Sequence, residues 1–99
     1  MLQVSHCAVC RTDAKIWKYG HRDLVLPRIP GHEICGKISG SAKRYVVWPG
    51  IACGKCAQCI RGSENLCRKM RIIGFHEDGG FAEFTAVPEK SLIAVPDDL

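Results

Sequence analysis

The sequence predicts a mostly β fold: a small β-barrel or sandwich with short helices, from which a cysteine-rich lobe projects. Short apolar runs recur along the chain with Gly and Pro between them, and this pattern indicates strands and turns. Four of the seven cysteines lie within residues 53–67, among small or polar neighbours, and this cluster predicts the lobe. Because the chain has 99 residues, we expect residues 1–99 to form a single domain.

In the first third of the chain we expect a strand, a helix and an extended segment. Residues 1–9 are moderately apolar and predict the strand. The short helix that follows should be capped by Thr12 or Asp13. Its expected apolar face consists of Ala14, Ile16 and Trp17. Residues 24–30 should be extended, because each proline pushes the residue before it toward the β region.

Four further strands are predicted along the rest of the chain. Residues 34–38 and 45–48 flank a turn, and residues 91–95 form a last strand before Pro96. Residues 81–87 show the clearest alternation of side chains between two faces. Three large apolar side chains are candidates to line a substrate pocket, but packing in the core is the better explanation for each; these are Trp17, Trp48 and Phe75.

The cysteine lobe should span residues 49–70. Its cysteines follow the spacing C-x2-C-x2-C-x7-C and are Cys53, Cys56, Cys59 and Cys67. The residues between them offer little apolar surface to bury, so the lobe needs another source of stability. A tetrahedral metal ion bound by four thiolates can provide it. All-sulfur tetrahedral sites select zinc or iron, and zinc is the first candidate for a structural metal here.

Other uses of these cysteines remain open. The bacterial iron–sulfur run ends with an interval of three residues and a proline, whereas the last interval here is seven and Arg68 follows. Disulfides would leave one of the seven cysteines unpaired and would fit a secreted protein, but residues 1–3 do not open like a signal peptide. Reduced cysteines without a metal prefer apolar surroundings, which this segment lacks.

Charge and hydropathy bear on the expected partners. The net charge of +4 is modest, and the one basic cluster, residues 68–71, is typical of a solvated face rather than of a nucleic-acid surface. No run of twenty apolar residues predicts a membrane span. We therefore expect a cytoplasmic protein with no nucleic-acid and no membrane partner.

Cys10 and His32 form a second candidate metal site. Thiolate and imidazole are common zinc ligands, and Glu33 is placed to support a histidine ligand. Thr12 offers a hydroxyl that can pass a proton to a metal-bound oxygen. From spacing alone, a buried core thiol and a turn histidine remain the commoner explanation of Cys10 and His32.

Four segments, taken together, resemble a known family. They are residues 10–13 (Cys-Arg-Thr-Asp), 31–33 (Gly-His-Glu), 53–67 (the cysteine run) and 79–84 (Gly-Gly-Phe-Ala-Glu-Phe). In this order and spacing they resemble the catalytic, GroES-like domain of the zinc-dependent medium-chain alcohol dehydrogenases. The resemblance covers the whole chain and implies a small GroES-like β-barrel.

The resemblance also implies roles for individual residues. Cys10 and His32 would be two of the three ligands of a catalytic zinc, with Glu33 as the glutamate beside them. Thr12 would hydrogen-bond the substrate alcohol and start a proton relay, and Arg11 would contact the cofactor pyrophosphate. The structural zinc would be held by Cys53, Cys56, Cys59 and Cys67. The implied reaction is hydride transfer from a zinc-bound small alcohol to the nicotinamide of NAD or NADP, or the reverse reaction of an aldehyde.

The chain also departs from the family pattern. Lys15 stands where many members have a relay histidine, and residues 38–45 are shorter than the corresponding loop. No G-x-G-x-x-G occurs, so we expect no dinucleotide-binding domain within residues 1–99, and the third catalytic ligand has no position there. Cys7 or Glu33 is a candidate to complete the site.

We therefore expect a truncated catalytic domain that is inactive as an isolated chain and able to self-associate into a homo-oligomer through exposed strand edges. The alternative is a non-enzymatic structural zinc module that mediates protein contacts. The two hypotheses differ at Cys10 and His32, because only an enzyme domain needs them as ligands.

Overall fold

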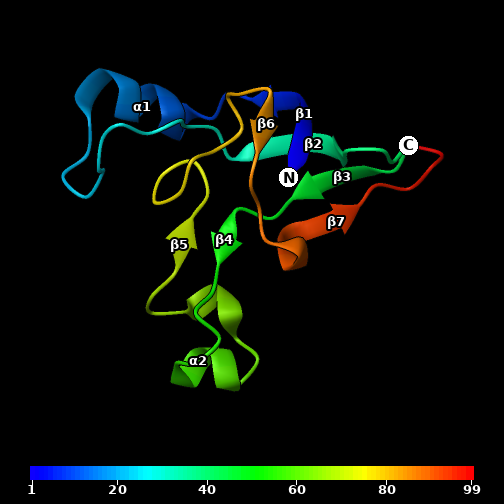
Figure 1. Ribbon diagram of the computed structural model, residues 1–99. Helices are drawn as coiled ribbons and strands as arrows, with labels where there is room; N and C mark the ends of the chain where they lie inside the picture. Colours follow the sequence, from blue (N-terminus) through cyan, green and yellow to red (C-terminus); the bar gives the residue numbers. More distant parts are fainter.

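A five-stranded antiparallel sheet is the largest element of the computed structural model, which describes residues 1–99 (Figure 1). The strand order is β6-β1-β2-β3-β7. The strands are β1 (Leu2–Ala8), β2 (Glu33–Ile38), β3 (Arg44–Val47), β6 (Phe84–Thr85) and β7 (Leu92–Ala94). The predicted mostly β fold is confirmed, and four of these strands, all except β6, lie close to their predicted positions.

The pairing of β1 with β2 explains where the core lies. Leu2 pairs with Ile38 and Cys7 with Ile34, so alternate side chains of both strands point to the same covered face. A compact cluster is buried there: Leu2, Ile34, Val47 and Ile73. Burial of these aliphatic side chains stabilises the sheet.

Helix α1 (Arg11–Tyr19) differs from its prediction at its start and on its faces. Cys10, not Thr12 or Asp13, is the N-cap, and the Asp13 carboxylate accepts a hydrogen bond from the Cys10 N–H at 2.9 Å. The face expected to be buried is turned outward, because Trp17 is 90% exposed while Asp13 is only 6% exposed. The buried Asp13 carboxylate, through its hydrogen bond with Cys10 N–H, therefore sets which face of the helix is turned inward. The expectation of core packing is also wrong for Trp48, which is 55% exposed.

The predicted strand at residues 81–87 is only partly present. Its regular part is β6, which pairs Phe84 with Gln3. Just before it, the N–H groups of Gly79, Gly80 and Phe81 donate to carbonyls of residues 29–31 instead of to β1. This diversion shortens the strand and ties the glycine pair to another loop.

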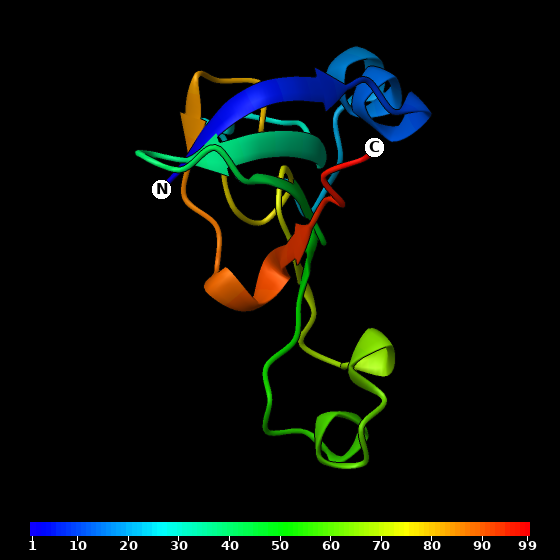
Figure 2. The same ribbon diagram turned by 90° about the vertical axis from the view of Figure 1, so that its right-hand side faces the viewer.

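The cysteine lobe projects from the sheet on a two-stranded ribbon (Figure 2). The ribbon pairs β4 (Gly50–Ile51) with β5 (Arg71–Ile72). Within the lobe lie α2 (Ala57–Ile60) and the 3-10 helix η1 (Glu64–Leu66), and a second 3-10 helix, η2 (Glu89–Ser91), precedes β7 on the sheet side. The lobe has its own small core of Ala52, Cys59 and Cys67. None of the helices is both long and apolar enough to span a membrane.

Candidate functional site

The four cysteines of the lobe converge on one point. Their sulfur atoms are separated by 3.9 Å (Cys53–Cys59), 3.5 Å (Cys56–Cys59) and 3.9 Å (Cys56–Cys67). Four ligands at the usual zinc–sulfur bond length of about 2.3 Å around a tetrahedral ion lie about 3.8 Å apart. The thiol cluster therefore has the size and donor set that a zinc ion requires, and it can bind zinc.

Backbone N–H groups point at these sulfurs. Cys53 N–H donates to Cys67 Sγ at 3.3 Å, and Lys69 N–H donates to the same atom at 3.4 Å. Lys55 N–H and Cys56 N–H donate to Cys53 Sγ at 3.4 and 3.3 Å. Donors of this kind favour thiolates over thiols, and the thiolate is the form that binds metal.

The thiols of the lobe are consequently unequal. The backbone N–H groups of Cys59 and Arg68 lower the pKa of Cys56 to about 6. The N–H groups of Lys55 and Cys56 also lower the pKa of Cys53. Burial, and then the neighbouring Cys56 sulfur, raise the pKa of Cys59 to about 12. In the absence of metal, Cys56 is therefore the most acidic of these three thiols.

A second group forms at the end of the sheet, where β1 meets β2. Ala8, the last residue of β1, pairs with Glu33, the first residue of β2. Cys10 lies just beyond that end of β1, and His32 lies just before β2, so the pairing brings both to the same place. One ligand atom from each of Cys10, His32 and Glu33 lies within 4.8 Å of the others. A thiolate, an imidazole and a carboxylate are suitable ligands for zinc.

Asp13 belongs to this group, although the sequence indicated it only as a helix cap. One carboxylate oxygen accepts the Cys10 N–H, and the other, Oδ1, lies 3.5 Å from His32 Nδ1. Oδ1 is buried and has no hydrogen-bond partner. A carboxylate beside one imidazole nitrogen orients a histidine so that its other nitrogen can bind a metal, which fits a metal at this site. The spacing of Asp13 three residues after Cys10 is the signal that could have revealed it.

Glycines hold the loop that carries His32. Gly31 has a φ of +102°, and a Cβ there would lie 2.9 Å from Cys7 Sγ and from Phe81 N. Gly79 and Gly80 donate their N–H groups to Ile29 O (2.7 Å) and Gly31 O (2.9 Å). A side chain at Gly79 would overlap the carbonyl oxygen of Gly31. The Gly79-Gly80 pair therefore fixes the backbone next to a candidate ligand.

The other candidate residues lie around this group. Arg11 and Thr12 occupy the exposed first turn of α1, next to Cys10, and Lys15 is exposed on the same helix. Cys7 is not among the grouped ligands; of the two residues considered to complete the site, Glu33 is the one the structure places there. Cys7 packs against the buried cluster of the sheet, and this burial raises the pKa of its thiol.

Two largely apolar cavities adjoin Asp13. One has a volume of about 390 Å³ and is lined in part by Trp17, Leu24 and Leu26. The other has a volume of about 330 Å³ and is lined in part by Trp17 and Phe81. Volumes of this size are typical of small-molecule sites.

Comparisons with known proteins indicate the family to which the chain belongs. The family model of the alcohol dehydrogenase GroES-like domain matches residues 1–97. The chain is 34% identical over 102 residues to L-galactonate-5-dehydrogenase of Escherichia coli, covering 94% of this chain and 30% of that protein. It is also 34% identical over 111 residues to L-threonine 3-dehydrogenase of Rhizobium rhizogenes, covering 100% of this chain and 32% of that protein.

A solved structure is similar over the same region. The crystal structure of a zinc-binding dehydrogenase from Sinorhizobium meliloti bound to NADP matches with a TM-score of 0.84 and 38% identity, covering 99% of this chain and 31% of that one. The chain thus spans about a third of the length of the relatives it matches. Since the family match runs over nearly every residue, the chain belongs to the alcohol dehydrogenase GroES-like domain family.

Proposed function

We propose that this chain is the zinc-binding catalytic domain of an NAD- or NADP-dependent alcohol dehydrogenase, with Cys10, His32 and Glu33 at the reaction centre. The grouping of these three ligand atoms within 4.8 Å is the observation that carries the proposal. A zinc ion bound there would act as a Lewis acid toward a substrate oxygen. The four cysteines of the lobe would hold a second, structural zinc.

The chain's own residues have separate tasks in this proposal. Asp13 orients His32 and fixes the Cys10 backbone, so that both ligands are placed before a metal arrives. Thr12, two residues after Cys10, supplies the hydroxyl that exchanges a proton with the substrate. Arg11, on the exposed first turn of α1, supplies a cation for the cofactor pyrophosphate.

The substrate class follows from the cavities and the relatives. The apolar cavities beside Asp13 suit a small organic molecule. Threonine and galactonate, named in the relatives, are both hydroxy acids. We therefore favour a small alcohol or hydroxy acid, oxidised in a longer protein that includes a dinucleotide-binding domain.

Zinc content measured by native mass spectrometry tests this proposal. The chain should carry two zinc ions, and the double variant Cys10→Ser, His32→Ala should carry one. Cys7→Ser serves as the matched control and should still carry two, because Cys7 lies outside the ligand group. One zinc in both the wild type and the double variant would leave only the lobe metallated, and would favour the alternative of a non-enzymatic zinc module.

A further inference from the structure

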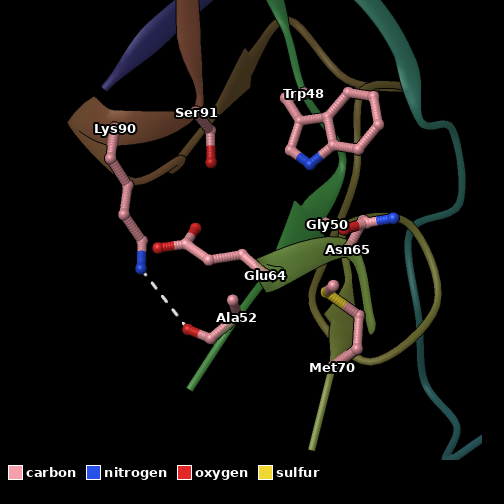
Figure 3. Close-up of a pocket in the computed structure, with 8 residues that line it drawn as sticks. All are labelled: Trp48, Gly50, Ala52, Glu64, Asn65, Met70, Lys90 and Ser91. Carbon is pink, nitrogen blue, oxygen red and sulfur yellow. Dashed lines mark hydrogen bonds between the residues drawn. The ribbon is translucent and has the colours of Figure 1, made fainter. Parts of the chain in front are cut away.

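A third site lies at the junction between the cysteine lobe and the sheet (Figure 3). It is a cavity of about 180 Å³ whose walls come from four separate segments: residues 48–52 at the start of the ribbon, helix η1 in the lobe, Met70 just before β5, and helix η2 beside the sheet. None of its lining residues belongs to either metal group. Its chemistry is therefore independent of the proposed reaction centre.

The most informative group in this cavity is the Ser91 hydroxyl. Ser91 is only 1% exposed, and its Oγ has no hydrogen-bond partner. Figure 3 shows this oxygen pointing from η2 into the cavity. A buried hydroxyl without a partner costs free energy, so the position is explained by an occupant that bonds to it.

Opposite charges face the same space. Lys90 Nζ donates to Ala52 O at 3.4 Å, and an ammonium group has two further N–H bonds to offer. The Glu64 carboxylate, which comes from the lobe, extends toward Lys90 and Ser91 in Figure 3. None of the ion pairs of the chain joins Glu64 to Lys90, so both charges are available to a ligand placed between them.

The opposite wall adds a donor and the necessary room. The Trp48 indole Nε1 points into the cavity in Figure 3 and has no hydrogen-bond partner within the chain. A Cβ at Gly50 would lie 3.1 Å from this nitrogen and 3.1 Å from Met70 Sδ. Glycine at this position therefore keeps the space beside the indole open. The Asn65 amide completes the polar lining.

We propose that this cavity binds a small zwitterion of the α-amino acid class. The three donors, Lys90, Ser91 and Trp48, suit its carboxylate, and the acceptors Glu64 and Asn65 suit its ammonium group. The volume lies below the range of about 300 Å³ at which drug-sized sites begin, so the ligand has few heavy atoms, as in glycine, alanine or serine.

Such a ligand would tie the lobe to the sheet, because Glu64 stands on the lobe while Lys90 and Ser91 stand beside β7. The ribbon of β4 and β5 is otherwise the main connection between the two parts. Binding should therefore stiffen the junction and raise the melting temperature of the zinc-loaded chain.

The test is an NMR titration of the zinc-loaded chain with glycine. The chain has two tryptophans, so the indole N–H signal of Trp48 reports the cavity, and that of the exposed Trp17 is the internal control. We expect a saturable shift of Trp48 alone, with a dissociation constant of about 1–10 mM, as is reasonable for so small a ligand. Acetate and methylammonium, each carrying one charge of the zwitterion, should bind at least about fivefold more weakly.

Variants separate this proposal from its alternatives. Glu64→Gln and Ser91→Ala should each weaken glycine binding at least about fivefold while zinc content stays unchanged. The double variant Cys10→Ser, His32→Ala should bind glycine normally, so that failure of the proposed reaction centre would not affect this result. No saturable shift up to about 100 mM, or shifts of equal size with acetate and with glycine, would overturn the proposal and leave a cavity filled by water.

Discussion

At the scale of single residues, Asp13 connects the two parts of the second metal group. Its carboxylate contacts the Cys10 backbone through one oxygen and approaches the His32 imidazole with the other. The Asp13 side chain is buried, and burial of a carboxylate costs free energy unless hydrogen bonds or an opposite charge compensate for the lost water. Asp13 therefore controls both the start of α1 and the orientation of a candidate ligand.

Replacing Asp13 by Asn tests this control. Asn keeps the size and one acceptor for the Cys10 N–H, but loses the charge that faces His32. We expect zinc affinity at the second site to fall by about 10- to 100-fold, as is usual when the partner of a ligating histidine is removed. Calorimetric titration of zinc into the metal-free chain measures this change.

The matched control is Asp23→Asn. Asp23 also lies near a histidine, with 3.9 Å between its carboxylate and His21 Nδ1, but this pair is exposed and belongs to neither metal group. Zinc binding should be unchanged in this variant. Equal affinities for wild type and Asp13→Asn would show that the carboxylate serves the helix cap alone.

Gly79 is a second residue whose importance comes from close packing. A methyl group there would overlap the Gly31 carbonyl, and Gly31 precedes His32. We expect Gly79→Ala to destabilise the chain by about 1–3 kcal/mol, as overpacking does, and to reduce zinc binding at the second site. Urea unfolding and zinc content measure the two effects.

Gly40→Ala separates this steric effect from backbone strain. Gly40 has a φ of +82°, but a Cβ there would meet nothing within 4 Å. This variant should lose stability through strain alone and should retain both zinc ions. If Gly79→Ala also kept both ions, the glycine pair would not be needed to place His32.

At the scale of elements, backbone N–H groups of the cysteine lobe donate hydrogen bonds to the cysteine sulfurs and so favour the thiolate form that binds metal. In short turns of the lobe, N–H groups point at the Cys53 sulfur, and the N–H groups of Cys59 and Arg68 act on the Cys56 sulfur. Because the pKa of Cys56 is lowered by folding, the stability it contributes is present above its ordinary pKa of about 8.5 and is lost as pH falls through about 6. Zinc should accordingly dissociate as the solution becomes acidic.

Alkylation of the metal-free chain tests this order of acidity. At pH 7, iodoacetamide should modify Cys56 well before Cys59, because the pKa of Cys56 is about 6 and that of Cys59 is about 12. Peptide mass spectrometry gives the rate at each cysteine. Added zinc should protect both residues, and faster modification of Cys59 than of Cys56 would contradict the prediction.

At the scale of the whole molecule, two small cores are separated by a ribbon. The sheet core contains Leu2, Ile34, Val47 and Ile73, whereas the lobe core contains only Ala52 and two of the cysteines. The lobe thus has almost no aliphatic packing of its own, and metal binding would supply most of its stability.

Zinc removal should therefore unfold one part of the molecule before the other. After treatment with a strong chelator, hydrogen exchange should accelerate at the Ile60 and Cys67 amides, which are protected by bonds within the lobe. The amides that pair β1 with β2 should remain protected. Simultaneous loss of protection in both regions would mean that the two cores form one cooperative unit.

Several features of the molecule could be predicted from the sequence because they are local. The four cysteines lie within fifteen residues, so their spacing alone restricts how they can converge. The strand near residues 1–9 followed from its moderately apolar composition, and those near residues 34–38 and 45–48 followed from short apolar runs with a turn between them. The Cys10 and His32 pair was indicated by resemblance, and by spacing alone would have remained ambiguous.

Other features depended on contacts between distant segments, which periodicity does not reveal. The apolar pattern of α1 predicted that Trp17 would be buried, but the contact of Asp13 with His32 turned the helix the other way. The shortening of the strand at residues 81–87 depended on the glycine pair bonding to residues 29–31.

The sequence by itself thus determined the strand pattern and the zinc-binding lobe, because both arise from residues close together in the chain. Tertiary structure alone decided that Asp13 lies beside the group of Cys10 and His32, that Glu33 rather than Cys7 belongs to this candidate ligand group, and that Ser91 is buried without a partner in the junction cavity. Each of these depends on strand register and on the meeting of segments far apart in sequence, since only the pairing of backbones fixes which side chains come within bonding distance.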